Sequence, residues 1–216
     1  MGLRLPAAAN IRMTSEDDPA PYYYRPLLRY PYKKRLRIAL GLMGERRFDS
    51  LLDIGYGSGV FFPELSRRCG RLTGLDLHRS GALVRGMMRR EGLRGGLGVG
   101  DVCRLPLRDE AFDGVVCLSV LEFVEDLGEA LDEIHRVMAP GGLAVLGAPV
   151  LNRVTGLAYE RLIRHMKHKD QHKSDHRRIL REAGARFEIV EEKRFLPGMP
   201  RDYAFFFCIS CRKAAR

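Results

Sequence analysis

"LLDIGYGSGVF", residues 51–61, carries three glycines at alternate positions directly after an apolar run that ends in an aspartate. Glycine adopts backbone angles that other residues avoid, and it lets a ligand approach the main chain closely. Such a turn is typical of the first strand of a doubly wound sheet, whose ligands bind beyond the carboxyl ends of the strands. The stretch therefore predicts a strand, a ligand-binding turn and a following helix.

The residue types in the turn separate the ligands that it could bind. A nucleoside triphosphate loop closes with Gly-Lys-Ser/Thr, whereas Gly59 is followed by Val60 and Phe61. The dinucleotide pattern G-x-G-x-x-G/A fails in both frames, because its last position falls on Val60 or Phe62. Asp53 adds a negative charge, which repels phosphate and favours a cationic ligand.

Two more acids follow expected strands. Asp76 ends the strand-like segment in "LTGLDLH", where a carboxylate can accept hydrogen bonds from both hydroxyls of a ribose. Asp101, in "GDVCRLPL", is placed to accept a hydrogen bond from the exocyclic amine of adenine. These positions predict a nucleoside ligand that carries an amine and no phosphate.

Strand-like and helix-like segments alternate through the middle of the chain, which predicts a parallel sheet covered on both faces. Strands are expected at 50–54, 72–77, 98–102, 114–119 and 143–148. Helices are expected at 32–44, 60–69, 81–90, 127–138 and 174–183. Two successive strands after residue 184, joined by a turn containing "LPGMP", predict a hairpin that completes the sheet.

Length and composition favour one globular domain of 216 residues with a net charge of +10. The basic residues concentrate in 25–47 and 153–181, which indicates either a solvated surface or contact with nucleic acid, an anionic membrane surface or an acidic substrate. No apolar run approaches the roughly 20 residues of a membrane span, and neither a signal peptide nor a disulfide framework is evident. We expect a cytoplasmic protein; the oligomeric state is not indicated.

Four stretches taken together resemble the successive motifs of class I S-adenosylmethionine-dependent methyltransferases. They are "LLDIGYGSG", "LTGLDLH", "GDVCRLPLRDEAFDGVVCLSVLEFVED" and "EIHRVMAPGGLAVLGAP". Within that class they are similar to the type 11 small-molecule methyltransferase family, from about residue 51 to residue 149. The resemblance implies a Rossmann-like α/β fold: a doubly wound, seven-stranded, mostly parallel sheet with an antiparallel last strand and helices on both faces. It also implies S-adenosyl-L-methionine as the cofactor and a small molecule as the methyl acceptor.

The resemblance implies a role for each matching position. The methionine portion of the cofactor is expected to contact Asp53, Gly55, Tyr56, Gly57, Ser58 and Gly59. The ribose and adenine are expected to contact Asp76, Leu77, Asp101 and Val102, and the sulfonium and its methyl to face Leu118 and Ser119. Tyr56 departs from the residues usual at its position, so we expect it to reshape the methionine pocket. Some quinone-modifying relatives carry Glu-His where this chain has Glu122 and Phe123, so no metal role is expected there.

Methyl transfer from a sulfonium depends on alignment, and it needs a general base only for a hydroxyl or a protonated amine. Four of the six histidines (165, 168, 172 and 176) lie within 12 residues, in the segment that forms the acceptor-side lid in the similar family. His172 is therefore the expected acceptor-side catalytic residue. A solvated basic loop is the plainer interpretation of this cluster, and a metal site is a third; we expect no metal.

We expect a single methyltransferase domain with five parts. These are a mobile arm at 1–24, a helical cap at 25–48, the cofactor-binding core at 49–150, an acceptor-side lid and helix at 151–184, and the terminal strand hairpin at 185–216. Tyr22 to Tyr24 either close the ligand pocket or pack on the sheet edge. Cys208 and Cys211 would point to opposite faces of a strand, which argues against a zinc or redox role.

Two alternatives to a small-molecule methyltransferase remain. The basic clusters favour methylation of RNA or protein, although "CLSVLEF" lacks the Asn-Pro-Pro-Tyr type of motif that holds a flipped base, so nucleic acid is a less favoured partner. A non-catalytic binding module of the same fold is the other alternative. The retained Asp53, Asp76 and glycine turn argue against it, because a degenerate module need not keep a ligand pocket.

Overall fold

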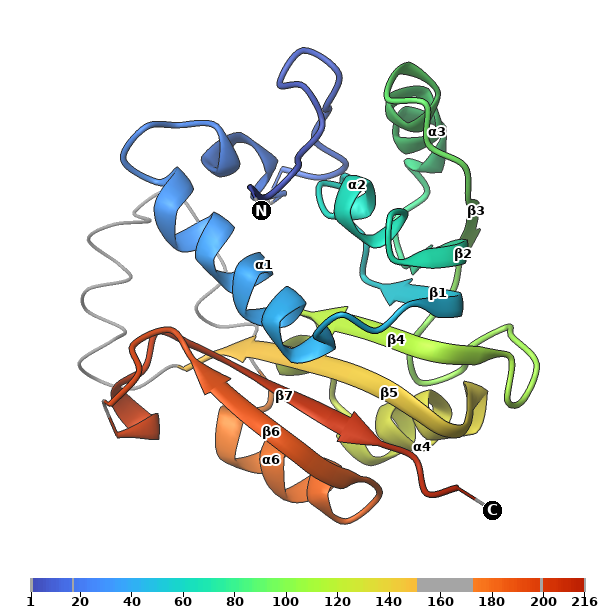
Figure 1. The fold of residues 1–216 in the computed structure, drawn as a ribbon, viewed down its shortest axis with the longest axis vertical. Coiled ribbons are helices and arrows are strands. Elements are labelled where there is room, and N and C mark those ends of the chain that lie inside the picture. The colour runs from blue at the N-terminus through green and yellow to red at the C-terminus, as the bar shows by residue number, and fades with distance from the viewer. Residues whose placement is uncertain (1, 17, 151–172, 199, 216) are drawn as a thin grey trace.

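The computed structural model of the protein describes residues 2–16, 18–150, 173–198 and 200–215 (Figure 1). Within them, seven strands form one sheet in the order β3-β2-β1-β4-β5-β7-β6. The strands are β1 (Phe48–Ile54), β2 (Cys69–Asp76), β3 (Gly96–Val99), β4 (Phe112–Leu118), β5 (Met138–Pro149), β6 (Glu188–Arg194) and β7 (Phe206–Arg212). The strands from β3 to β5 pair in parallel, and β7 runs antiparallel between β5 and β6. The expected fold class, including the terminal hairpin, is confirmed.

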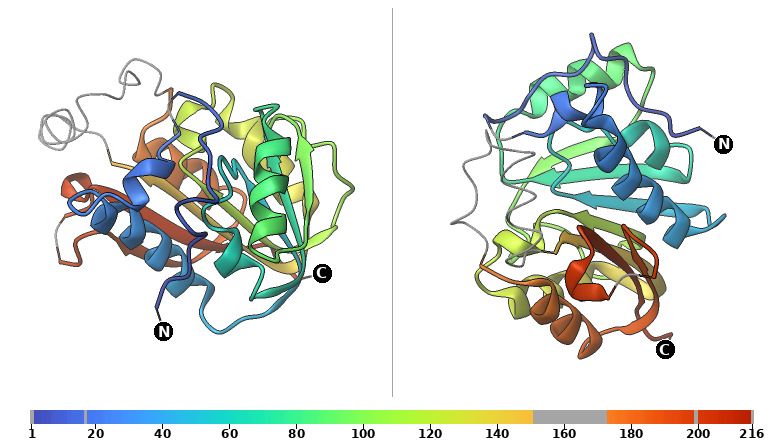
Figure 2. Two further views of the ribbon diagram at one scale, coloured as in Figure 1. Left: turned by 90° about the horizontal axis from the view of Figure 1, so that it is seen from above. Right: turned by 90° about the vertical axis from the view of Figure 1, so that its left-hand side faces the viewer.

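Helices cover both faces of the sheet, as the alternating pattern predicts (Figures 1 and 2). The α-helices are α1 (Arg29–Met43), α2 (Phe62–Leu65), α3 (Gly81–Arg90), α4 (Leu127–Val137) and α6 (His176–Gly184); short 3₁₀ turns are η1 (Ala20–Tyr23), η2 (Leu121–Phe123) and η4 (Arg201–Tyr203). One core cluster joins α4 and α6 to the sheet, and a second joins α1, α2 and α3 to the opposite face. Adjacent residues along β1 and β4 enter different clusters, because strand side chains alternate between faces.

Several expected elements differ in extent from those observed; β5, for example, begins at Met138 and not at residue 143. The helix expected at 60–69 is only α2, because Cys69 already pairs with Phe48 at the start of β2 and draws the chain out of the helix. The third strand, expected at 98–102, is β3 and ends at Val99, so Asp101 lies in the turn that follows it. By contrast, α3 has the predicted bounds. The helix α6 begins after Asp175, because the Asp175 side chain caps it by accepting a hydrogen bond from the Arg178 amide.

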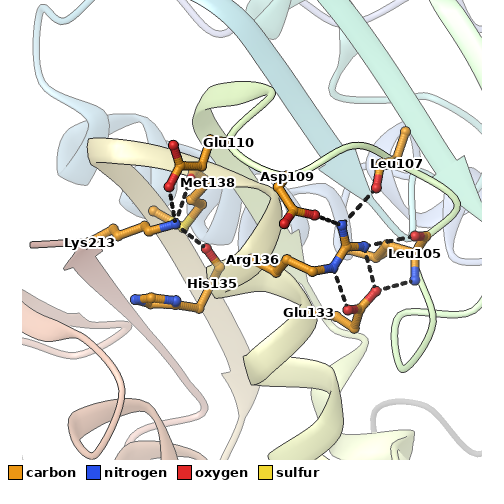
Figure 3. Close-up of polar contacts among 9 residues, drawn as sticks. All are labelled: Leu105, Leu107, Asp109, Glu110, Glu133, His135, Arg136, Met138 and Lys213. Carbon is orange, nitrogen blue, oxygen red and sulfur yellow. Dashed lines mark hydrogen bonds and ion pairs between the residues drawn. The ribbon is translucent and has the colours of Figure 1, made fainter.

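The segment between β3 and β4 is held by the end of α4 (Figure 3). The Arg136 guanidinium donates to the carbonyl oxygens of Leu105 and Leu107 at 3.0 and 2.8 Å, and it also pairs with Glu133 and Asp109. Nearby, the buried Lys213 ammonium donates to the carbonyl oxygens of His135 in α4 and Met138 at the start of β5. The charge-assisted bonds of Arg136 hold the loop that carries Asp101.

The N-terminal residues lie against α2 and α3. The backbone amide of Arg4 donates to Glu64, and Glu91 accepts from the Ala7 amide and from the Asn10 side chain at 2.7 and 2.6 Å. These contacts tie the first residues to the core, while the five-part division of the chain remains a prediction. Within the described ranges, every helix is too short or too polar to pass through a bilayer.

Candidate functional site

The glycine turn lies where the strand order reverses. β1 pairs with β2 on one side and with β4 on the other, so the loops leaving β1 and β4 diverge at the carboxyl edge of the sheet. This is the crevice in which doubly wound folds bind ligands. The turn after β1 and Ser119 after β4 form its two sides.

All three glycines of the turn have positive φ: +74° at Gly55, +51° at Gly57 and +73° at Gly59. A Cβ at Gly55 would lie 2.1 Å from Val120 Cγ2, and one at Gly59 would lie 2.8 Å from the Met87 methyl carbon. These two glycines are required by close packing as well as by backbone angle. At Gly57, a Cβ would meet no described atom within 4 Å, so this backbone is open to a ligand.

Asp76, at the end of β2, is tied to the turn. Its Oδ2 accepts the Gly57 amide at 2.8 Å, and its Oδ1 accepts the His78 amide at 3.2 Å. The His78 Nε2 lies 2.9 Å from the Gly57 carbonyl oxygen, which closes the arrangement. A carboxylate has about four acceptor sites, so each Asp76 oxygen retains capacity for a ligand hydroxyl.

Asp53 is the second acid of the site and is only 5% exposed. Burial, and then the charge of Asp76, raise the pKa of Asp53 well above its usual range. A buried carboxylate next to another one is costly unless a positive charge neutralises it. The pair therefore favours a cationic ligand.

The side chain of Tyr56 turns away from the open face of the turn into the helical layer. Its ring packs on Phe62 and edge-on to His78, with centroids 5.6 and 4.9 Å apart. The same ring occupies the space that a side chain at Gly74 of β2 would fill. The Tyr56 side chain thus packs β2 against α2. Only the backbone of Tyr56 is left to face the crevice.

Ser58 joins the turn to the N-terminal segment. It is buried, and its hydroxyl donates to Asp18 Oδ1 at 3.3 Å. Asp18 is also buried and accepts from the backbone amides of Thr14 and Ala20. Asp18 was not predicted from the sequence, because "SEDDPAP" reads as a polar arm without strand or helix periodicity.

Ser119 stands at the end of β4 with φ +58°, an angle that is uncommon outside glycine. Its amide donates to the Gly147 carbonyl oxygen at 2.8 Å, and its Oγ accepts from Arg35 Nη1 at 3.2 Å. The same guanidinium donates to the Tyr23 hydroxyl at 2.6 and 3.0 Å and lies over the Tyr23 and Tyr32 rings. Arg35 therefore holds η1, α1 and the end of β4 together, a role hidden in the sequence among several basic residues.

The tyrosines before α1 are packed rather than open. Tyr23 is 1% exposed, and Tyr22 stacks on Tyr32 with centroids 5.3 Å apart. The Tyr24 hydroxyl donates to the Pro6 carbonyl oxygen. This favours the packing interpretation, with Tyr23 acting on the site through Arg35.

The remaining predicted positions differ in their surroundings. Leu77 is 68% exposed beside the crevice, whereas Val102 is buried in the core under α4. Asp101 is exposed, and its Oδ1 accepts the Cys103 amide at 2.9 Å. Leu118 is half-buried at the end of β4, against Gly147.

The acceptor side is described only in part. His172, with His165 and His168, lies outside the described residues. His176 is buried at the start of α6, with Nε2 2.8 Å from Asp202 Oδ1, and so ties this helix to η4. In the described ranges, no group of three His, Cys, Asp or Glu side chains is arranged to hold a metal ion.

Comparison with known proteins identifies the segment that builds this site. Residues 52–146 match a family model described as a methyltransferase domain. This segment is therefore a methyltransferase domain of that family. S-adenosylmethionine is the cofactor of this family.

Two curated relatives each match about half of the chain. A malonyl-[acyl-carrier protein] O-methyltransferase of Serratia marcescens is 35% identical over 106 residues, covering 48% of this chain and 40% of the relative. A ubiquinone biosynthesis O-methyltransferase of Pseudomonas aeruginosa is 31% identical over 112 residues, covering 49% and 45%. The chain spans less than half the length of the curated relatives it matches.

Solved structures share the fold over most of the chain. The N-methyltransferase NodS of Bradyrhizobium japonicum, in complex with S-adenosyl-L-homocysteine, has a TM-score of 0.68 at 22% identity and covers 94% of this chain and 95% of its own. A [4+2]-cyclase, SpnF, has a TM-score of 0.67 at 18% identity, covering 85% and 81%. At these identities the likeness shows the fold, and the cyclase shows that different reactions use it.

The residues of the crevice fit the cofactor of the family. The buried Asp53 suits its positive charges, and the unfilled acceptor capacity of Asp76 suits the hydroxyls of its ribose. The open backbone at Gly57 leaves room for a ligand beside Asp76.

Proposed function

We propose that the protein transfers a methyl group from S-adenosyl-L-methionine to a small-molecule acceptor by in-line displacement. The observation that carries this proposal is the pair Asp53 and Asp76 beside the open, positive-φ backbone of Gly57. Two carboxyl groups at a bare turn, with no lysine or arginine within it, match a cationic nucleoside and oppose a phosphate.

Each residue of the site has a task in this proposal. Asp53 attracts the positive charge of the methionine portion, and Asp76 accepts hydrogen bonds from the ribose hydroxyls. Leu77 and Asp101 are proposed to border the adenine, with Val102 supporting them from the core. The cofactor, when bound, supplies an electrophilic methyl group on its sulfonium.

Ser119 and Leu118 border the place where we propose that the acceptor approaches. Arg35 and Tyr23 fix the Ser119 hydroxyl, and the Ser119 amide is held by β5, so this end of β4 is rigid before a ligand arrives. Such alignment of the reacting groups contributes roughly 7–11 kcal/mol to reactions of this kind. His172 remains a proposed acceptor-side base.

The relatives support a small acceptor without naming it. Two of them are named for O-methyl transfer, one to a malonyl-[acyl-carrier protein] and one in ubiquinone biosynthesis. The net charge of +10 favours the second candidate, methylation of RNA or of an acidic protein.

The test uses methyl-labelled cofactor with separate pools of small metabolites, RNA and protein. We expect label in a small metabolite, and we expect Asp76→Asn to abolish most of the transfer. Asp49→Asn, an exposed acid at the other end of β1, is the matched control and should transfer label normally. Label confined to RNA or protein would replace the proposal with its second candidate, and no label in any pool would refute methyl transfer.

A further inference from the structure

A separate pocket of 650 Å³ opens between η2 and the start of α6. Pro149 brings it to the carboxyl edge of β5, and Glu122 lies three residues after Ser119. The amides of Lys173 and Ser174 donate to the Glu122 carbonyl oxygen at 2.8 and 3.2 Å, which ties its two walls together. The pocket thus adjoins the end of β4, on the side away from the glycine turn.

Four basic side chains and two carboxyl groups line this pocket. The basic ones are Lys173, Arg177, Arg178 and Arg181, and the acids are Glu122 and Asp175. Lys173 and Arg177 pair with acids outside the pocket, namely Glu125 and Asp202. Asp175 is engaged by the backbone amide of Arg178 as the cap of α6.

The Arg178 and Arg181 charges are left to the pocket. Arg178 is half-buried, and in the described part of the chain its guanidinium donates to two neutral oxygens, Ser174 Oγ and the Glu125 carbonyl, at 3.2 and 3.3 Å. Arg181 is exposed and lies 3.4 Å from Glu182, which also pairs with Arg186 at 3.0 Å. An ion pair with a solvent-exposed arginine contributes little, so both guanidinium groups retain affinity for an anion.

Glu122 supplies the second observation that points to a ligand. It is 2% exposed, and within the described residues its Oε2 has no hydrogen-bond partner. Burial raises the pKa of Glu122 to about 8, against the opposing effects of its own backbone amide and of Arg35. Near neutral pH the carboxyl group is therefore largely protonated and can donate a hydrogen bond. A buried polar atom without a partner destabilises the protein until a ligand satisfies it.

The chemistry of the walls excludes two classes of occupant. A cation would be repelled by the basic side chains, and a purely apolar molecule would leave Glu122 unsatisfied. We propose that this pocket binds the carboxylate or phosphate group of the acceptor, held by Arg178 and Arg181, with Glu122 hydrogen-bonded to an oxygen of the same molecule. The statement that this molecule is the methyl acceptor rests on the proposed function. The existence of the anion site does not depend on it.

The test titrates the whole chain with malonate and, separately, with inorganic pyrophosphate, following heat and melting temperature. We expect at least one of these anions to bind, and the better one distinguishes a carboxylate site from a phosphate site. The double variant Arg178→Gln/Arg181→Gln should lose at least about tenfold in affinity, since each hydrogen bond to a charged group contributes strongly. Arg89→Gln, which removes the same charge from α3, should bind as the unchanged protein does.

Glu122 is tested by two substitutions. Glu122→Gln keeps a hydrogen-bond donor and should bind within a few-fold of the unchanged protein, whereas Glu122→Leu should lose about tenfold or more. Failure of both anions to bind, equal binding by the double arginine variant, or equal binding by Glu122→Leu would each overturn the proposal. A parallel titration with S-adenosyl-L-homocysteine separates the two hypotheses: its failure counts against the methyltransferase proposal and leaves the anion site standing.

Discussion

Replacing Glu122 by glutamine should stabilise the protein, and the gain should grow with pH. In the folded protein burial raises the pKa of this carboxyl group to about 8, whereas its usual value is 4.5. Between these two values the folded state binds a proton that the unfolded state has released. The free energy of unfolding therefore falls as pH rises through this window, and it stops falling above the folded-state pKa.

The size of the effect follows from the same two values. Each pH unit inside the window lowers the free energy of unfolding by about 1.4 kcal/mol. The whole window therefore sets an upper limit of about 5 kcal/mol on this loss. Between about pH 5 and about pH 8 the cost should grow by about 3–4 kcal/mol. Glutamine has nearly the same shape and does not titrate. The stability of Glu122→Gln minus that of the unchanged protein should thus rise by this amount.

Urea denaturation followed by circular dichroism at several pH values, at constant ionic strength, measures this difference directly. All other titrating groups contribute equally to both proteins and cancel. Glu188→Gln, on the exposed part of β6, is the matched control, because it makes the same chemical change at an exposed position. A difference for Glu122→Gln that stays constant with pH would refute the reasoning, because it would mean that the Glu122 carboxyl titrates as it does in water.

Three further results are expected at the glycine turn. Affinity for S-adenosyl-L-homocysteine should rise with pH, by at most about tenfold per pH unit, because Asp53 must lose its proton to meet the ligand's ammonium group; calorimetry of Asp53→Asn should show a flat profile. Gly57→Ala and Gly92→Ala should each cost about 1–2 kcal/mol of folding stability, since both glycines have positive φ and open surroundings, yet only the first should weaken ligand binding. Gly55→Ala should cost more than either in thermal melts, because its Cβ would lie 2.1 Å from Val120 Cγ2; an equal cost would show that Val120 yields easily.

The parallel core of the sheet and its terminal hairpin could be predicted from the sequence because local patterns indicate them, whereas the seven-stranded topology came from the resemblance to a known family. Apolar strands alternate with amphipathic helices, and the glycine turn marks the end of the first strand. The predicted and observed bounds of α3 agree fully. Cys208 and Cys211 do enter cores on opposite faces of β7, as strand geometry requires.

The errors arise where tertiary pairing overrides local pattern. Residues 66–69 have helical periodicity, but the pairing of Cys69 with Phe48 places Cys69 in β2. Arg35 meets Ser119 across 84 residues, a separation at which no local pattern carries information. Tyr56 drew attention as an unusual residue in a ligand turn, and the structure gives its side chain a packing role against β2.

The central claim is that the two acids and the bare turn bind a cationic adenine nucleoside, and calorimetric titration with S-adenosyl-L-methionine tests it most directly. The unchanged protein and Asp49→Asn should bind alike. Asp76→Asn should bind at least about tenfold more weakly, because it loses charge-assisted hydrogen bonds to the ribose hydroxyls. Absence of binding by the unchanged protein, or equal affinity in Asp76→Asn, would contradict the account.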